Sequence, residues 1–154
     1  MNVDNRAHIG WREWLVLPDL GVPAIKAKID TGARSSALHT HDYEIVDRLG
    51  QPYVIFRLHP FTDDPSIEVI REEPVTEFRV VKDSGGHAER RPFIRTRVLL
   101  GPYQWVIDLN LTNREKMKFR MLLGREAMKR RFRVVPEASY MLSPQPLEPL
   151  GADE

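Results

Sequence analysis

The chain has 154 residues, of which 42% are hydrophobic and 29% charged, and its formal net charge is +1. This length and composition are typical of one folded domain with a core of its own. A net charge so close to zero gives no electrostatic reason to expect a membrane or nucleic-acid partner. The chain has no cysteine, which excludes disulfides, thiolate zinc ligands and thiol catalysis and fits a reducing compartment.

The first half of the chain is predicted to form strands joined by turns. An apolar run at residues 14–17 is followed by turn residues at 18–21. From Ile25 to Ile29 apolar residues alternate with lysines, and this period of two predicts a half-buried strand that ends at Asp30. Further strands are predicted at residues 37–46, 53–58, 67–70, 77–81, 93–100, 105–111 and 133–135. A short helix is predicted at residues 125–132, which are rich in good helix formers.

Three segments are expected from the change in composition along the chain. Residues 1–10 are polar and predict a flexible N-terminus, and residues 11–142 predict one β-rich domain. Residues 143–154 are rich in proline, which supports neither a helix nor a central strand, so we expect a disordered or extended tail. Because no apolar run reaches the roughly 18 residues of a membrane helix, we expect a cytoplasmic protein.

The acid at the end of the lysine-flanked strand is the most informative candidate residue. Asp30 is followed directly by Thr31, Gly32 and Ala33. Two carboxylates about 3 Å apart share one proton, so that one accepts a proton from water while the other polarises a peptide carbonyl. Gly32 permits a close backbone approach, and the Thr31 hydroxyl can both donate and accept. The second carboxylate would have to come from a second copy of the chain.

Two further features follow this motif along the chain. The glycine-rich turn Ser84-Gly85-Gly86 comes first, and the run Leu122-Leu123-Gly124-Arg125 comes later. In this order the three features resemble the subunit of retropepsin-like aspartic proteases over residues 14–135. The stretch of residues 28–39 is similar to a bacterial branch often labelled ATP-dependent zinc protease. Members of that branch are associated with ATP-grasp ligases that add glutamate to a ribosomal protein.

The resemblance implies a mostly all-β fold, in which a closed β-barrel of the acid-protease type carries one short C-terminal helix. It also implies a homodimer that acts as an aspartic-type peptidase without a cofactor. The implied roles are catalysis for Asp30, Thr31 and Gly32, substrate binding for Ala33, Arg34 and the flap residues Ser84, Gly85 and Gly86, and structural support for Leu122, Leu123, Gly124 and Arg125.

One position departs from the pattern of the family. Viral members carry an acid directly after Asp-Thr-Gly-Ala, where it pairs with the arginine of the helix, whereas this chain has Arg34. The brace provided by Arg125 would therefore need another acid, such as Glu126. A cation beside the site would favour an acidic peptide. We therefore expect acidic or glutamylated protein tails as substrates and a functional link to a glutamate ligase.

Three alternatives were weighed against this reading. The branch label suggests a zinc peptidase, and His39 and His41 would lie on one face of a strand as possible ligands. No third ligand is evident, and the chain has neither a His-Glu-x-x-His helix nor a phosphate-binding glycine loop, so no metal is predicted. A second alternative is a non-catalytic module of the same fold that binds peptides or dimerises. The basic cluster within residues 116–133 suggests RNA binding, but it lacks interleaved aromatic residues, and no direct nucleic-acid contact is expected.

Overall fold

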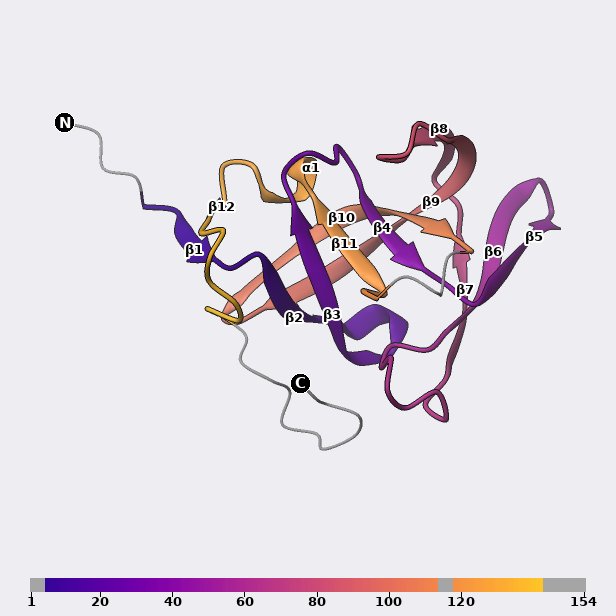
Figure 1. Ribbon diagram of the computed structural model, residues 1–154. Coiled ribbons are helices and arrows are strands. Elements are labelled where there is room, and N and C mark those ends of the chain that lie inside the picture. Colours follow the sequence, from indigo (N-terminus) through magenta and orange to yellow (C-terminus); the bar gives the residue numbers. More distant parts are fainter. Residues whose placement is uncertain (1–4, 114–117, 143–154) are drawn as a thin grey trace.

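The computed structural model describes residues 5–113 and 118–142, and strands dominate this part of the chain (Figure 1). The strands are β1 (Ala7–Ile9), β2 (Arg12–Leu17), β3 (Val22–Asp30), β4 (Ser36–His39), β5 (Asp42–Arg48), β6 (Gln51–Leu58), β7 (Val69–Pro74), β8 (Glu77–Lys82), β9 (Ala88–Leu100), β10 (Tyr103–Thr112), β11 (Met121–Gly124) and β12 (Phe132–Val134). The helical segments are the 3-10 turn η1 (Pro18–Leu20) and the helix α1 (Arg125–Met128). Neither of these two described segments is long and apolar enough to cross a membrane.

Six strands close into a barrel. Their order is β10-β4-β11-β3-β2-β9, and antiparallel pairing between β9 and β10 joins the two ends. Closure satisfies the backbone groups that an open sheet would expose along its edges. The prediction of a mostly all-β, closed barrel with one short helix is therefore confirmed, whereas the homodimer stays a prediction.

The barrel is held together by the inward-facing side chains of its strands. In β3, Ile25 and Ala27 are fully buried, whereas Lys26 and Lys28 reach solvent to different degrees. The alternation of apolar and charged residues therefore marks the buried face correctly, because successive side chains of a strand point to opposite faces. The other strands of the barrel add Leu15, Leu17, Leu38, Ile94, Leu109 and Leu123 to the same core.

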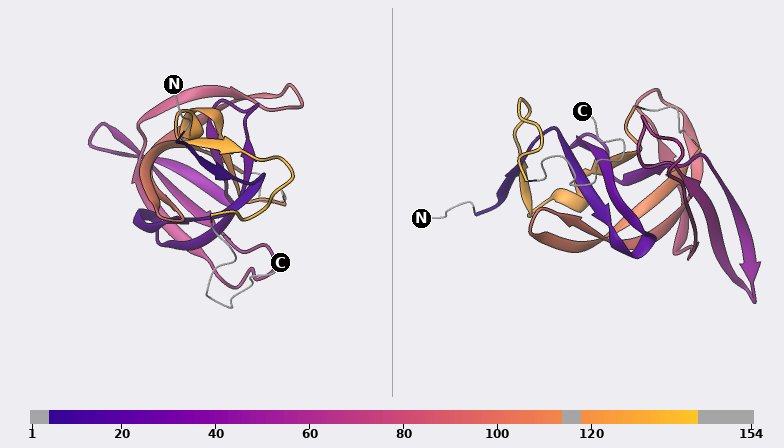
Figure 2. Two further views of the ribbon diagram at one scale, coloured as in Figure 1. Left: turned by 90° about the vertical axis from the view of Figure 1, so that its left-hand side faces the viewer. Right: turned by 90° about the horizontal axis from the view of Figure 1, so that it is seen from below.

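A second, three-stranded sheet of β5, β6 and β7 extends away from the barrel (Figure 2). The single strand predicted at residues 37–46 is wrong, because the chain leaves the barrel between β4 and β5. The N–H of Thr40 donates to the Thr112 carbonyl at 2.8 Å, while the next N–H, of His41, donates to the Arg57 carbonyl at 2.8 Å. Consecutive amides thus pair with different sheets, which no local sequence pattern reveals.

The N-terminal segment is more ordered than its polar composition predicts. Strand β1 pairs in parallel with β12, and Ile9 is fully buried in the barrel core. The prediction of a flexible segment at residues 1–10 is therefore wrong for residues 7–10, because one apolar side chain and a strand partner far away in the sequence hold them. The predicted tail at residues 143–154 lies outside the described residues.

The helix is shorter than predicted. Helix α1 ends at Met128 rather than at residue 132, because Lys129 has ψ of 139° and Arg130 has a positive φ of 70°. These backbone angles lie outside the helical region. The turn they create lets the chain enter β12.

A buried carboxylate fixes the last described residues against the barrel. Glu13 is completely buried. It accepts hydrogen bonds from the N–H groups of Gly10 at 2.7 Å, Met141 at 2.8 Å and Leu142 at 3.3 Å. A buried charge is tolerated when hydrogen-bond donors surround it in this way. One acidic side chain therefore connects both ends of the described chain.

We expect Glu13→Gln to lower the free energy of unfolding by about 1.5–3 kcal/mol, since an amide cannot accept all three bonds. Chemical denaturation measures this loss, and amide hydrogen exchange of Met141 and Leu142 should become faster. The matched control is Glu44→Gln, which replaces an exposed glutamate of β5. Equal stability of the two variants would contradict the anchoring role.

Candidate active site

The site is built where β11 inserts between β3 and β4. Strand β11 runs parallel to β3, with Gly124 opposite Asp30, and antiparallel to β4, with Leu122 opposite Ala37. The connection from β3 to β4, residues 31–35, must therefore pass over the end of β11. Of the predicted supporting residues, Leu123 and Gly124 are buried under this connection and Leu122 is half-buried.

Asp30 stands at the end of β3 with its carboxylate held by the turn that follows. Its Oδ1 accepts hydrogen bonds from the N–H groups of Gly32 at 2.9 Å and Ala33 at 3.2 Å. The side chain is partly exposed, and its other oxygen, Oδ2, accepts no hydrogen bond from the residues that the structure describes. The carboxylate is thus fixed in orientation, with one oxygen available to a water or to a second chain.

The start of α1 supports the turn from below. The N–H groups of Arg125 and Glu126 donate to the carbonyls of Ala33 at 2.7 Å and Arg34 at 3.0 Å. The N–H of Gly124 donates to the Ser36 hydroxyl at 3.0 Å. Helix α1 accordingly lies next to the connection between β3 and β4 (Figure 1). The first N–H groups of a helix lack partners within it, and here the turn supplies them.

A glycine is required at position 124 by the closeness of this packing. A Cβ added there would lie 2.5 Å from the Ser35 carbonyl oxygen and 2.6 Å from its carbon. Both contacts are with backbone, which cannot rotate away as a side chain can. The turn that carries Asp30 and the strand beneath it are therefore in direct contact.

Gly124→Ala is expected to destabilise the fold by about 1–3 kcal/mol and to displace the Asp30 turn, because the added methyl overlaps backbone atoms. Thermal or chemical unfolding measures the loss. Gly85→Ala serves as control, since its nearest neighbours are side-chain atoms at 3.4 Å, and it should change stability by less than about 0.5 kcal/mol. Comparable effects at the two positions would refute the close contact.

Arg125 contacts the turn, and no acid of residues 5–113 or 118–142 forms an ion pair with it. Its Nη1 donates to the Thr31 carbonyl at 2.9 Å. Glu126 pairs instead with Lys129 at 3.0 Å and with Arg34 at 4.0 Å. The hydrogen bond from Lys129 is the main reason that the pKa of Glu126 lies below its usual value, with Arg34 and Arg125 adding to it. In the expected pattern an acid on the turn pairs with an arginine on the helix. Here the charges are exchanged, because the cation Arg34 lies on the turn and the acid Glu126 lies on the helix.

The predicted flap residues lie at the tip of the hairpin formed by β8 and β9. Ser84, Gly85 and Gly86 are exposed, and Gly86 has a positive φ of 87° that suits glycine. Among the described residues, no hydrogen bond or ion pair joins them to the Asp30 turn. Sequence reasoning missed Asp83, whose Oδ1 accepts from the N–H groups of Gly85 and His87 at 2.9 Å each and so shapes this tip. A flap role for these residues stays a prediction.

Asn110 is a further residue that sequence reasoning missed. It is buried and donates to the Ser36 carbonyl at 2.8 Å and to the Ser35 hydroxyl at 3.3 Å. Its own amide oxygen accepts from Arg91 Nη1 at 3.0 Å, and Arg91 in turn pairs with Glu89 at 2.8 Å. A polar network therefore connects β9, which carries the hairpin, with the start of β4. The sequence signal that could have identified Asn110 is its place between two leucines of β10, where a polar side chain interrupts an apolar strand.

The histidines proposed as zinc ligands do not share a strand face. His39 is buried in β4, and its Nδ1 lies 2.7 Å from the Phe119 carbonyl oxygen. His41 lies beyond the end of β4, where its ring contacts that of His59 at 5.3 Å between centroids. The predicted pair of ligands on one face is wrong because the strand ends between them. Within residues 5–113 and 118–142 no group of three His, Asp or Glu side chains could hold a metal, so zinc does not fit this part of the chain.

Comparison with known families agrees with this geometry. Residues 8–145 match the RimB-like family model, whose description is the retropepsin-like aspartic endopeptidase RimB. The chain belongs to the RimB-like family. The matched residues include the Asp30 turn, the hairpin and β11, so that the resemblance seen in the sequence holds for most of the chain.

Relatives of this RimB-like chain include larger proteins. It is 44% identical over 142 residues to "Probable alpha-L-glutamate ligase" of Shewanella halifaxensis, a match that covers 92% of this chain and 31% of that protein. A protein of the same name from Parasynechococcus marenigrum is 46% identical over 134 residues, covering 87% of this chain and 29% of that protein. The chain therefore spans less than a third of these curated relatives. The crystal structure of Lpg0085, a Legionella pneumophila protein of unknown function, superposes with a TM-score of 0.71 at 26% identity, covering 88% of this chain and 98% of that one.

Proposed function

We propose that this RimB-like chain is one half of a cytoplasmic, homodimeric aspartic endopeptidase. The observation that carries the proposal is the state of Asp30, whose Oδ1 is held by two backbone N–H groups while the side chain stays partly exposed at the end of β3. The turn therefore holds the carboxylate in one orientation and leaves its other oxygen available to a water or to a second chain.

In the proposed reaction the Asp30 carboxylates of two subunits face each other across a two-fold axis and share one proton. The ionised member removes a proton from water, and the protonated member donates a hydrogen bond to the scissile carbonyl. The hydroxyls of the two Thr31 residues bond each other across the axis, and the Gly32 carbonyl accepts from the peptide backbone. The hairpin tips close over the peptide and exclude water.

A hollow beside Thr31 supports a second copy as the partner. It measures about 570 Å³ and is lined by Thr31, by the cations Arg6, Arg125, Lys129 and Arg133, and by apolar residues. These apolar residues are Trp11, Ile29, Met128, Phe132 and Val134. The apolar part of this hollow adjoins the residue expected at the axis and offers a second subunit surface to bury.

For the substrate we propose acidic or glutamylated protein tails. The relatives that contain a region like this chain are named as glutamate ligases, and hydrolysis of glutamate-bearing tails would oppose such a ligation. Arg34, four residues after the catalytic aspartate, would favour an anionic peptide. A functional link to an ATP-grasp glutamate ligase follows from the same reasoning.

Asp30→Asn is expected to lower cleavage of a glutamate-rich peptide by at least about a thousandfold, because the amide can neither share nor accept the proton. The fold and the dimer should persist, as judged by circular dichroism and solution mass. Asp63→Asn, in an exposed loop, is the matched control and should retain full activity. Cleavage that survives in Asp30→Asn would exclude the mechanism, and a peptide that wild-type protein binds without cutting would instead indicate a binding module.

Mixing the two proteins tests whether both carboxylates serve one site. After subunit exchange in an equal mixture of wild type and Asp30→Asn, roughly a quarter of the wild-type activity should remain, because random pairing leaves that share of intact homodimers. The rate is measured at constant total protein. A value of roughly a half would mean that each chain acts alone.

A further inference from the structure

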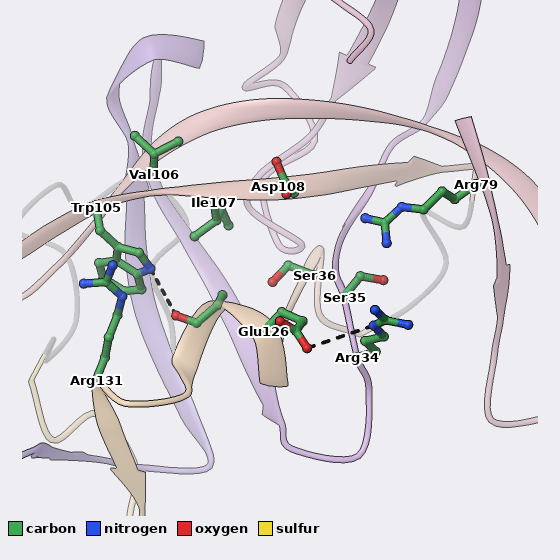
Figure 3. A pocket seen from close by; sticks show the side chains of 11 residues that line it. Arg34, Ser35, Ser36, Arg79, Trp105, Val106, Ile107, Asp108, Glu126 and Arg131 are labelled. Carbon is green, nitrogen blue, oxygen red and sulfur yellow. Dashed lines mark hydrogen bonds and ion pairs between the residues drawn. The ribbon is translucent and has the colours of Figure 1, made fainter. Parts of the chain in front are cut away.

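A cavity of about 260 Å³ opens beside the turn that carries Asp30. Its walls come from the start of β4 and the turn before it, from β10, from α1 and from one residue of β8 (Figure 3). Trp105 and Ile107 of β10 give it an apolar side, and Ser35 and Ser36 add polar groups. The cavity therefore combines a surface for methylene groups with hydrogen-bonding groups next to the proposed catalytic residue.

Three arginines from three separate segments line this cavity. Arg34 belongs to the turn after Asp30, Arg79 to β8 and Arg131 to the segment that follows α1. In Figure 3 the side chains of Arg34 and Arg79 lie near Ser35 at one end, and Arg131 lies beside Trp105 at the other. The Arg131 guanidinium carbon is 5.3 Å from the centroid of the Trp105 ring. Positive charge is thus placed at both ends of an apolar wall.

Arg79 is held in place by an aromatic ring and by an acidic neighbour, Glu77. Its guanidinium carbon lies 4.0 Å from the centroid of the Phe93 ring, which fixes the plane of the group. Its Nε is buried and makes no hydrogen bond within the described chain, although the Glu77 carboxylate lies 3.2 Å away. Among the described residues neither Nη of Arg79 makes a hydrogen bond or ion pair, so both can donate to an anionic ligand.

The acids near the cavity offset these charges only in part. Asp108 pairs with Arg95 at 3.1 Å, and Glu126 pairs with Lys129 at 3.0 Å. Both of these cations lie outside the residues that line the cavity. Glu126 also lies 4.0 Å from Arg34, and Glu77 lies 3.2 Å from Arg79. The three arginines and two acids that line the cavity still leave it with a formal charge of +1.

We propose that this cavity is the specificity pocket of the enzyme, in which Arg79 and Arg34 bind the side-chain carboxylate of a glutamate residue of the substrate while Ile107 and Trp105 contact its methylene groups. A guanidinium donates two parallel hydrogen bonds to the two oxygens of a carboxylate. The side-chain amide of a glutamine has only one acceptor oxygen and cannot accept both bonds. Arg131, at the far end, would bind the carboxylate of a second acidic residue. The proposal rests on the proposed function, since it names the substrate class of the same site.

The test measures binding rather than cleavage, so that it does not depend on catalysis. In the Asp30→Asn protein, the affinities of a dye-labelled hexaglutamate peptide and of its hexaglutamine counterpart are compared by fluorescence anisotropy. The glutamate peptide should bind at least about tenfold more tightly. Arg79→Gln and Arg34→Gln, each in the Asp30→Asn background, should reduce this ratio toward one. Arg48→Gln, which removes the same charge at an exposed ion pair with Glu72 on the projecting sheet, should leave the ratio unchanged.

The outcomes separate this proposal from the peptidase assignment. Selectivity for glutamate that disappears in Arg79→Gln supports the pocket even if the wild-type protein cuts neither peptide. Equal affinity for the two peptides overturns the pocket, and so does an equal effect of Arg48→Gln and Arg79→Gln, even if the wild type cleaves both. The reverse variant Arg79→Glu should bind a hexalysine peptide more tightly than its parent does, and failure to do so would also count against the pocket.

Discussion

The architecture of the site depends on one close contact, in which the backbone of Gly124 lies directly against that of Ser35. A side chain at position 124 would clash with this backbone and prevent β11 from pairing with both β3 and β4. The whole support of the turn follows from that insertion, because it brings the first amides of α1 within reach of the carbonyls of Ala33 and Arg34. The orientation of Asp30 is therefore set by residues almost a hundred positions away in the chain.

Buried polar side chains also help to position the turn that carries Asp30. Asn110 contacts both Ser35 and Ser36, and Arg91 connects it to the strand that carries the hairpin. Each of these bonds is made in a region that excludes water, where an unmatched polar group would be costly. The Asp30 turn is thus positioned from two directions, by the backbone of β11 and α1 and by the side chain of Asn110.

The parts of this fold that could be predicted from sequence are those with a local cause. The alternation around Ile25 marks a strand, and the order of the Asp30 motif, the glycine-rich turn and the Leu-Leu-Gly-Arg run marks the family. What could not be predicted arises from contacts between distant segments: the break between β4 and β5, the pairing of β1 with β12, and the cluster of Arg34 with Arg79 and Arg131. None of these leaves a periodic signal, because each member of the pair looks ordinary within its own segment.

Strand β9 changes partners along its length, pairing with β8 up to Phe93 and with β10 from Phe93 onward. Phe93 is fully buried and marks the point where β9 leaves the barrel and continues into the hairpin with β8. Arg79 belongs to this hairpin and stacks on the phenyl ring of Phe93, whereas Arg34 belongs to the turn that follows Asp30. A ligand that contacts both arginines would therefore connect the β8–β9 hairpin directly to the turn that carries Asp30.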